Sequence, residues 1–293
     1  MTIREAKIIG LKKLKRASGN EAAIDAEILL AHVLKISREE LLTHDERRVP
    51  AFALAKFNAL IARRAKHEPV AYLTGRKEFF NLQFAVNKHV LIPRPETELL
   101  VEETLAQITH PTLSYNKRGG RCMVIDVGTG SGAIAVAIAK NAPDAVVIAT
   151  DISKAALKLA ALNAITNDVG DQIIFERADL LGLKNGRPTI FETAVITANL
   201  PYLPTKVWQK AMPDVKKFEP KSALVGGQDG LKYYDELFHQ IVERNIKAKI
   251  ICEIDPSQKR SFPRLAKRHF PGAAVEIKND LAGLPRMAIV TEN

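Results

Sequence analysis

Residues 124–139 read VIDVGTGSGAIAVAIA, an apolar run that leads into three alternating glycines and then into a run of small apolar residues. The first part is typical of a buried strand and the last part of a helix. Glycine lets a ligand approach the backbone closely, and a helix N-terminus offers unpaired N–H groups. Gly128, Gly130 and Ala133 also satisfy the dinucleotide-binding pattern. This stretch predicts a nucleoside-containing ligand and leaves its identity open.

From Cys122 onward, strand-like and helical segments alternate along the chain. The expected strands are 123–127, 145–150, 172–177, 193–198, 249–254 and 287–291. Alternation of this kind predicts an α/β fold with a mostly parallel sheet and helices on both faces. Ligands of such sheets bind outside the carboxyl ends of the strands. The polar stretch 110–120 is expected to be a loop.

Two acidic residues follow expected strands. Asp151 ends the second strand, where a carboxylate can accept hydrogen bonds from a ribose diol. Enzymes that bind NAD and enzymes that bind S-adenosylmethionine both use this arrangement. Asp151 could equally serve the start of the helix that follows Ser153. Asp179 follows the third strand and could face an adenine or be an ordinary loop residue.

The segment Asn199-Leu200-Pro201-Tyr202 follows the fourth expected strand. An Asn side-chain oxygen and an adjacent backbone carbonyl can both accept hydrogen bonds from one NH₂ group. Pro201 favours an extended Leu200, and Tyr202 offers a flat face for an amide or a base. The alternative is an ordinary turn after a strand. The order of glycine loop, acids and this tetrapeptide favours methyl transfer to nitrogen over hydride transfer.

Residues 1–70 predict a small helical bundle. Asn20 is a candidate helix cap, with Ile24, Ile28 and Ala31 on one helix face. Ser37 and Glu40 form a capping-box pattern. Residues 78–86 predict a hairpin centred on Asn81-Leu82. Pro93 and Pro95 precede a helix expected at about 97–108.

The composition of the 293 residues is that of a globular protein, with 46% hydrophobic and 26% charged residues. No apolar run is long enough to span a membrane. The two cysteines cannot form a disulfide framework, and the seven histidines show no metal-ligand spacing. The formal net charge of +10 favours a polyanionic partner, and a basic proteome would explain it equally well.

The segment 68–98, EPVAYLTGRKEFFNLQFAVNKHVLIPRPETE, closely resembles the linker of HemK/PrmC-type protein-(glutamine N5) methyltransferases. The resemblance extends over nearly the whole chain and includes residues 124–139. It implies a class I S-adenosylmethionine-dependent methyltransferase, Rossmann-like, with a seven-stranded, mostly parallel sheet. It also implies a small N-terminal all-α domain for substrate recognition at 1–74, a β-hairpin linker at 75–92 and a catalytic domain at 93–293.

The same resemblance implies a reaction: transfer of a methyl group from S-adenosyl-L-methionine to the glutamine side-chain amide in the Gly-Gly-Gln motif of peptide-chain release factors. It assigns the substrate amide to Asn199, Leu200, Pro201 and Tyr202. It assigns cofactor contacts to Thr97, Gly128, Thr129, Gly130, Ser131, Gly132, Asp151, Asp179, Leu180 and Asn199. The expected setting is cytoplasmic, without a membrane or a required nucleic-acid partner.

Leu200 departs from the family, which usually has Asn-Pro-Pro-Tyr. Asn-Leu-Pro-Tyr is similar to the motif of rRNA adenine N6-dimethyltransferases. An rRNA or DNA adenine methyltransferase and a ribosomal-protein glutamine methyltransferase therefore remain alternatives. A basic RNA-binding module with a decayed site is disfavoured because Gly128, Asp151 and Asn199 are all present. Gly226-Gly227-Gln228 also spells the target tripeptide, which we interpret as coincidence.

Overall fold

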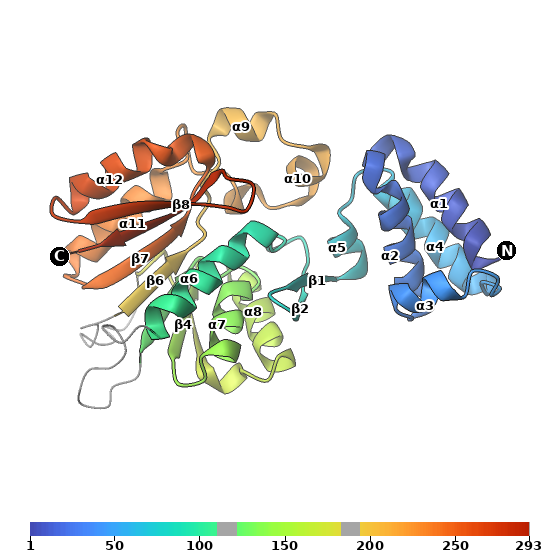
Figure 1. Cartoon of the computed structure of the whole chain (residues 1–293), viewed down its shortest axis with the longest axis horizontal. Coiled ribbons are helices and arrows are strands. Elements are labelled where there is room, and N and C mark those ends of the chain that lie inside the picture. The colour runs from blue at the N-terminus through green and yellow to red at the C-terminus, as the bar shows by residue number, and fades with distance from the viewer. Residues whose placement is uncertain (110–121, 183–193, 293) are drawn as a thin grey trace. The chain divides into compact units, whose positions relative to one another are not determined.

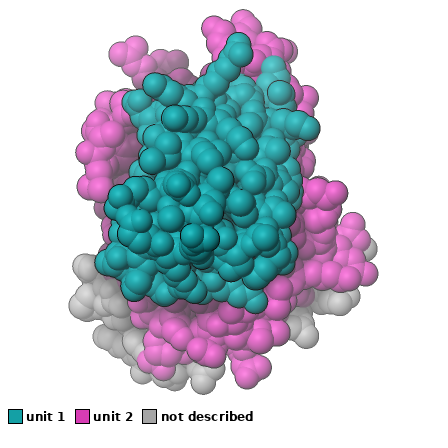
Figure 2. All heavy atoms as spheres, turned by 90° about the vertical axis from the view of Figure 1, so that its right-hand side faces the viewer, with its two compact units in different colours: residues 1–76, 211–219 teal, residues 77–210, 220–293 magenta. Residues whose placement is uncertain are grey.

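The computed structural model describes residues 1–109, 122–182 and 194–292 (Figure 1). The chain divides into two compact units, which Figure 2 shows in different colours. The first unit comprises Met1–Arg76 and Ala211–Glu219, and the second comprises Lys77–Lys210 and Pro220–Asn293. The sequence did not lead us to expect that residues 211–219 group with the N-terminal helices. The three-part division at 74 and 92 stays a prediction.

The first unit is helical. Its helices are α1 (Ile3–Ser18), α2 (Ala22–Leu34), α3 (Arg38–Thr43), α4 (Ala51–Arg64), α5 (Val70–Thr74) and α10 (Pro213–Phe218). Thr2 caps α1, because its hydroxyl accepts a hydrogen bond from the Glu5 backbone N–H while the Glu5 carboxylate accepts from the Thr2 backbone N–H. The Ser37 hydroxyl accepts from the Glu40 backbone N–H at 3.1 Å, so Ser37 caps α3 as expected.

The buried face of α2 differs from the expected one. Ile24 and Ile28 are exposed, whereas the buried side chains are those of Ala22, Asp25, Ala26, Leu29, Leu30 and Ala31. The Asp25 carboxylate accepts from Arg64 Nε of α4 at 2.7 Å. The helix is apolar on nearly every side, so periodicity did not select a face, and this buried ion pair marks the face that packs. The expected Asn20 cap is also wrong, since the helix begins after Glu21.

The predicted hairpin is present, with its turn one residue earlier than expected. Its strands are β1 (Arg76–Phe79) and β2 (Leu82–Ala85). The turn residues are Phe80 and Asn81, with φ of 50° and 58°. This left-handed conformation suits a two-residue hairpin turn and disfavours a bulky residue such as Phe. The Phe80 backbone N–H donates to Glu98 Oε1 at 2.9 Å, which holds the turn in place.

The second unit contains a seven-stranded sheet. Its strands are β3 (Met123–Val127), β4 (Val146–Asp151), β5 (Ile173–Arg177), β6 (Ala194–Ala198), β7 (Ala248–Glu253), β8 (Ala274–Asn279) and β9 (Pro285–Thr291). The spatial order is β5-β4-β3-β6-β7-β9-β8. The pairings from β5 to β7 are parallel, and β9 pairs antiparallel with both neighbours.

Pattern reading missed β8, because this edge strand carries exposed polar residues between its apolar ones and buries no side chain fully. The resemblance supplied the correct count of seven. The expected loop at 110–120 lies outside the described residues. The sheet changes direction of winding at β3, which has β4 on one side and β6 on the other. Parallel sheets bind ligands at such a switch point.

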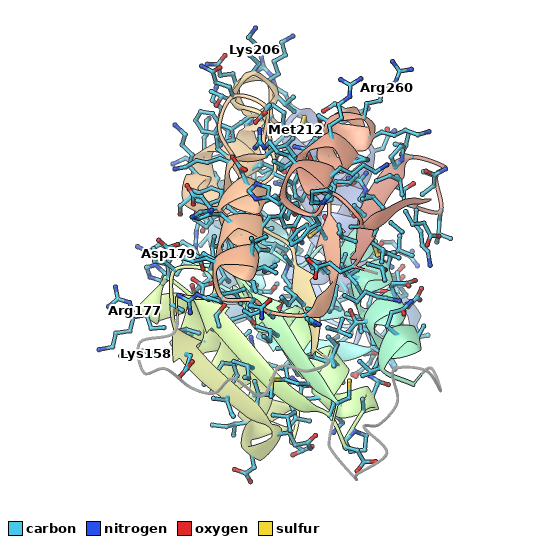
Figure 3. All side chains as sticks on the ribbon, turned by 90° about the vertical axis from the view of Figure 1, so that its left-hand side faces the viewer. Lys158, Arg177, Asp179, Lys206, Met212 and Arg260 are labelled. Atoms are coloured by element: carbon cyan, nitrogen blue, oxygen red, sulfur yellow. The ribbon has the colours of Figure 1, made fainter. Side chains whose placement is uncertain are left out.

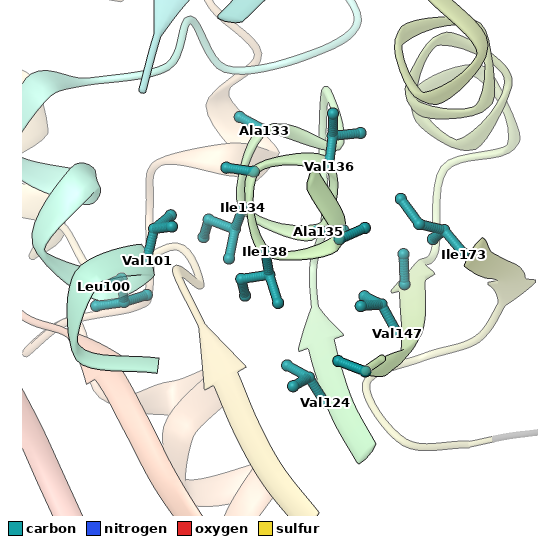
Figure 4. Packing of buried hydrophobic residues seen from close by; sticks show 14 of the residues in the cluster. Leu100, Val101, Val124, Ala133, Ile134, Ala135, Val136, Ile138, Val147 and Ile173 are labelled. Atoms are coloured by element: carbon teal, nitrogen blue, oxygen red, sulfur yellow. The ribbon is translucent and has the colours of Figure 1, made fainter. Parts of the chain in front are cut away.

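Helices α6 (Glu98–Thr109), α7 (Ala133–Asn141), α8 (Lys154–Thr166), α9 (Thr205–Gln209), α11 (Lys232–Glu243) and α12 (Ser261–His269) belong to this unit. Successive β3 residues enter different apolar clusters: Val124 joins the one containing α7, and Ile125 the one containing α11. The sheet is therefore covered on both faces. Figure 4 shows the α7 side chains among those of Leu100, Val124 and Val147. None of the helices in the described ranges has the length and apolar character to cross a membrane.

Candidate functional site

A cavity of about 340 Å³ opens at the carboxyl ends of the parallel strands. The parallel strand order brings the segments after β3, β4, β5 and β6 to this edge. The predicted site residues that line it are Thr97, Gly128, Thr129, Gly130, Ser131, Asp151, Asp179, Leu180, Asn199, Leu200 and Pro201. Gly132 and Tyr202 are not among its lining residues.

The loop after β3 depends on glycine. Gly128, Gly130 and Gly132 have φ of 76°, 56° and 81°, a region that disfavours side chains. A Cβ on Gly128 would lie 3.0 Å from Leu200 Cδ2, and a Cβ on Gly132 would lie 2.9 Å from Ala160 Cβ. Gly132 thus allows α7 and α8 to pack closely, whereas Gly128 and Gly130 leave the main chain open toward the cavity.

Asp151 joins this loop to the start of α8. Its Oδ2 accepts from the Gly130 N–H at 2.9 Å, and its Oδ1 accepts from the Ser153 N–H at 2.7 Å. Ser153 is the residue that caps α8, with its hydroxyl accepting from the Ala156 N–H at 3.2 Å. Burial raises the pKa of Asp151, while these two backbone hydrogen bonds lower it. The carboxylate is therefore both a structural tie and a group on the cavity wall.

Asp126 lies beneath the loop and was not predicted as a site residue. The Thr129 hydroxyl donates to its Oδ2 at 2.6 Å, and the Thr197 hydroxyl donates to its Oδ1 at 3.3 Å. The side chain is fully buried, and burial raises its pKa to about 6. Asp126 therefore connects the end of β3 with the end of β6.

The two residues predicted at the end of β5 differ in exposure. Asp179 is exposed and lies at the surface near the labelled Arg177 in Figure 3. Leu180 is buried with φ of 54°, and its carbonyl accepts from the Thr150 hydroxyl at 3.0 Å. Leu180 thus forms part of the apolar wall, and Asp179 contributes a carboxylate at the rim.

The Asn199 side chain is held through its nitrogen. Nδ2 donates to Thr97 Oγ1 at 3.0 Å and to Glu253 Oε2 at 3.1 Å. Tyr202 donates its hydroxyl to Glu253 Oε1 at 2.7 Å. Burial, followed by the nearby Glu253, raises the pKa of Tyr202 well above its usual value, so the phenol keeps its proton. Tyr202 therefore acts here as a donor.

The backbone around Leu200 is held by Tyr234 of α11. The Tyr234 hydroxyl donates to the Glu253 carbonyl, and the backbone N–H of Leu200 lies near enough to this hydroxyl to lower its pKa. Tyr234 is fully buried, and burial raises its pKa well above the usual value. A proline at position 200 would lack this N–H. Leu200 is therefore more than a spacer between Asn199 and Pro201.

The loop after Leu224 packs closely against the backbone of the tetrapeptide. A Cβ on Gly226 would lie 2.1 Å from the Pro201 carbonyl oxygen, and one on Gly230 would lie 1.9 Å from the Tyr202 carbonyl oxygen. Gln258 Nε2 donates to the Tyr202 carbonyl at 2.9 Å. Gly226, the first glycine of the Gly-Gly-Gln sequence, therefore has a packing reason, and Gly227 has a φ of 96°, in keeping with the interpretation of this tripeptide as coincidence.

Sequence reasoning missed four residues beneath the cavity: Asp126, Tyr234, Glu253 and Gln258. It also missed residues 89–94, which line the cavity except for Ile92. Glu253 had a usable signal, because it ends β7, the strand beside β6. The others become visible only through contacts. Within residues 1–109, 122–182 and 194–292, no three His, Cys, Asp or Glu side chains gather as a metal site would require.

Two family profiles match the chain. The PrmC N-terminal domain profile matches residues 6–75, and the profile of ribosomal protein L11 methyltransferase (PrmA) matches residues 108–214. The first covers most of the helical unit, and the second covers the strands that form the cavity edge.

Curated relatives extend the similarity to nearly the full length. A release factor glutamine methyltransferase of Thermodesulfovibrio yellowstonii is 34% identical over 270 residues, 92% of each chain. The one from Rhodopirellula baltica is 37% identical, covering 93% of this chain and 90% of its own. The one from Clostridium acetobutylicum is 39% identical, covering 80% and 79%.

Among solved structures, the human METTL16 catalytic domain in complex with MAT2A 3′UTR hairpin 1 superposes with a TM-score of 0.56. The sequence identity is 14%, and the match covers 80% of each chain. At this identity the likeness supports the methyltransferase fold and nothing further.

Proposed function

The chain belongs to the family of release factor glutamine methyltransferases, and from this premise we propose its reaction. It transfers a methyl group from S-adenosyl-L-methionine to the side-chain amide nitrogen of the glutamine in the Gly-Gly-Gln motif of peptide-chain release factors. The observation that carries the proposal is Asn199. Its nitrogen is occupied by Thr97 and Glu253, so its oxygen is left to accept a hydrogen bond beside the cavity.

The residues around the cavity fit the cofactor. Its volume of about 340 Å³ lies within the range of small-molecule sites. Each carboxylate oxygen of Asp151 accepts one backbone hydrogen bond and has a further lone pair for a ribose hydroxyl. We assign the main chain of 128–131 to the polar cofactor groups, Asp151 to the ribose, and Leu180 and Asp179 to the base. When bound, the cofactor supplies an electrophilic methyl group.

The task of this chain is to orient a weak nucleophile. The lone pair of an amide nitrogen is delocalised into the carbonyl. We assign the two N–H bonds of the substrate amide to Asn199 Oδ1 and the Leu200 carbonyl oxygen, with the Tyr202 ring beside the amide plane. Such orientation lowers the barrier without a charged base. Tyr202 keeps its proton and therefore does not serve as a base.

The two methyltransferase alternatives differ in substrate and share this geometry. Leu200 favours the adenine alternative, since Asn-Leu-Pro-Tyr is the motif that led to it. A flipped base presents an exocyclic NH₂ group much as an amide does. The family relatives outweigh this one residue, because they cover nearly the whole chain.

The test uses the full-length protein, labelled S-adenosyl-L-methionine and three separate substrates: a release factor, a ribosomal protein mixture and rRNA. We expect one methyl group on the glutamine of the release-factor Gly-Gly-Gln motif, located by mass spectrometry. Methylated rRNA adenine with an untouched release factor would establish the adenine alternative. A methylated ribosomal-protein glutamine with an untouched release factor would change the substrate and keep the chemistry.

We also propose that residues 1–74 recognise the release factor, and that the reaction takes place in the cytoplasm, where release factors meet ribosomes. The support is a basic face on α1, where Lys12, Lys13, Lys15 and Arg16 are exposed. Because residues 211–219 group with this unit, truncation would strip their packing partner, so variants of the full chain are the better probe.

The recognition test combines Lys12→Glu with Arg16→Glu. We expect KM for an intact release factor to rise ~5-fold, because charges at the rim of an interface govern encounter. KM for a short Gly-Gly-Gln peptide should stay the same. Arg264→Glu with Lys267→Glu is the matched control, since both residues are exposed on α12. Equal increases in KM for the two double variants would mean that α1 acts only through the net charge of the protein.

A further inference from the structure

Three side-chain donors converge on one buried carboxylate at the end of β7. Glu253 is 1% exposed. Its Oε2 accepts from the Thr97 hydroxyl at 2.6 Å and from Asn199 Nδ2 at 3.1 Å, and its Oε1 accepts from the Tyr202 hydroxyl at 2.7 Å. The donors come from α6's leading turn (Pro95–Thr97) and from the segment after β6. These three donors occupy three of the roughly four acceptor positions of a carboxylate.

These bonds allow one orientation of the Asn199 amide. Thr97 gives its only proton to Glu253, so toward Asn199 its oxygen is an acceptor. Both neighbours of the Asn199 amide group on this side therefore accept. An Asn199 rotated by half a turn would place its oxygen against two acceptors, which leaves a half-buried amide without a hydrogen bond on this side.

Tyr202 is fixed by the same carboxylate, and its backbone is fixed separately. The hydroxyl donates to Glu253 Oε1, while the Tyr202 carbonyl accepts from Gln258 Nε2 at 2.9 Å. The Glu253 carbonyl in turn accepts from the Tyr234 hydroxyl, which also lies 3.5 Å from the Ala198 carbonyl oxygen. Glu253 thus contacts the side chains of the first and last members of the tetrapeptide, Asn199 and Tyr202.

We propose that Glu253 is a positioning residue for methyl transfer. It acts through Asn199 and Tyr202, holding the Asn199 oxygen toward the substrate amide and the Tyr202 ring at its side. Glu253 is not among the residues that line the cavity, whereas Asn199 is, so Glu253 orients Asn199 without contacting the reacting atoms. This role rests on the proposed function, because the amide that Asn199 orients is the proposed substrate.

The test compares Glu253→Gln with Glu253→Met. Gln keeps an oxygen that can accept from Thr97 and Asn199 while its NH₂ group donates to Tyr202, so kcat should fall less than about fivefold. Met has a similar length and no acceptor, so kcat should fall ~30-fold or more. The Kd of S-adenosyl-L-methionine should change less than about threefold in both. Thr97→Val, which removes one acceptor, should lower kcat ~5-fold.

Glu103→Met is the matched control. Glu103 is another buried carboxylate, which binds Lys278 Nζ at 2.5 Å and does not line the cavity. Its loss should lower the thermal midpoint and leave kcat per folded molecule unchanged. Equal kcat of Glu253→Gln and Glu253→Met, per folded molecule, would overturn the positioning role and make Glu253 a structural residue like Glu103.

A second measurement does not depend on activity. In nitrogen-labelled protein, the two side-chain amide protons of Asn199 should give separate signals that exchange slowly with water. Their signals should shift and exchange faster with water in Glu253→Met and persist in Glu253→Gln. Unchanged signals in Glu253→Met would refute the inference even if the wild-type protein methylated no glutamine. Absent methylation with the expected signal change would refute the proposed function alone.

Discussion

The loop after β3 and the segment after β6 leave neighbouring parallel strands, and they are held in different ways. The glycine loop has three positive φ angles within five residues, and Asp151 accepts a hydrogen bond from its Gly130 N–H. The segment from Asn199 to Tyr202 is shaped by partners far along the chain, chiefly Thr97, Tyr234 and Glu253. A local motif thus shapes one wall of the cavity, and tertiary contacts shape the other.

The largest expected effect tests the segment Asn199–Tyr202, which tertiary contacts hold in place. Asn199→Ala removes the proposed acceptor for the substrate amide, and we expect methyl transfer to fall ~10²–10³-fold, as when one oriented hydrogen-bonding group is lost. The Kd of the cofactor, measured by calorimetry, should change far less. A comparable loss of cofactor affinity would show that the two walls do not act separately.

Asp126 bonds to Thr129 of the glycine loop and to Thr197 of β6. Its raised pKa of about 6 leads to a prediction of how stability depends on pH. A carboxyl whose folded pKa is raised stabilises the fold below its unfolded pKa, and this stabilisation is lost as pH rises through the folded pKa. The free energy of unfolding should therefore lose up to about 3 kcal/mol between pH 4 and pH 6 from this group.

Asp126→Asn should remove that dependence. Urea unfolding at several pH values gives the difference between variant and wild type, in which the other carboxyls cancel. This difference should shift in favour of the variant as pH rises across that window. Parallel curves for the two proteins would mean that Asp126 does not change its charge state on folding within the window.

Asp151→Ala tests the side of the cavity that the glycine loop forms. We expect cofactor affinity to weaken by ~1.5–3 kcal/mol, the scale of hydrogen bonds to a charged group. Ser37→Ala is the control, because it removes the cap of α3, away from the cavity lining, and should lower stability by ~1 kcal/mol with little change in Kd. If Asp151→Ala binds the cofactor normally, the carboxylate serves only Gly130 and Ser153.

Leu200→Pro restores the usual family tetrapeptide and has the smallest expected effect. It removes the backbone N–H that lies near the Tyr234 hydroxyl, so we expect a loss of up to ~1 kcal/mol in unfolding free energy. Tyr234→Phe also removes the hydrogen bond to the Glu253 carbonyl, so its loss of unfolding free energy should be larger than that of Leu200→Pro. The Leu200→Pro variant should still methylate the Gly-Gly-Gln substrate. Activity of the wild type on rRNA alone would instead identify Leu200 as part of an adenine pocket.

Much of the fold followed from local patterns. The strand–glycine–helix run at 124–139 and the alternation after Cys122 predicted the parallel sheet, because period and turn chemistry are local properties. The failures were local as well. The edge strand β8 is half exposed, α2 is apolar on nearly every side, and the Phe80–Asn81 turn uses a residue type that no turn rule selects.

By itself, the sequence determined the family, the sheet and which segments reach the cavity edge, since strand ends of a parallel sheet share one edge. The tertiary structure decided how the side chains there are oriented. Asn199 has its nitrogen fixed by Thr97 and Glu253, which are distant in sequence. A hydrogen bond depends on distance and direction in space, and no spacing along the chain encodes that the ends of β6 and β7 lie side by side.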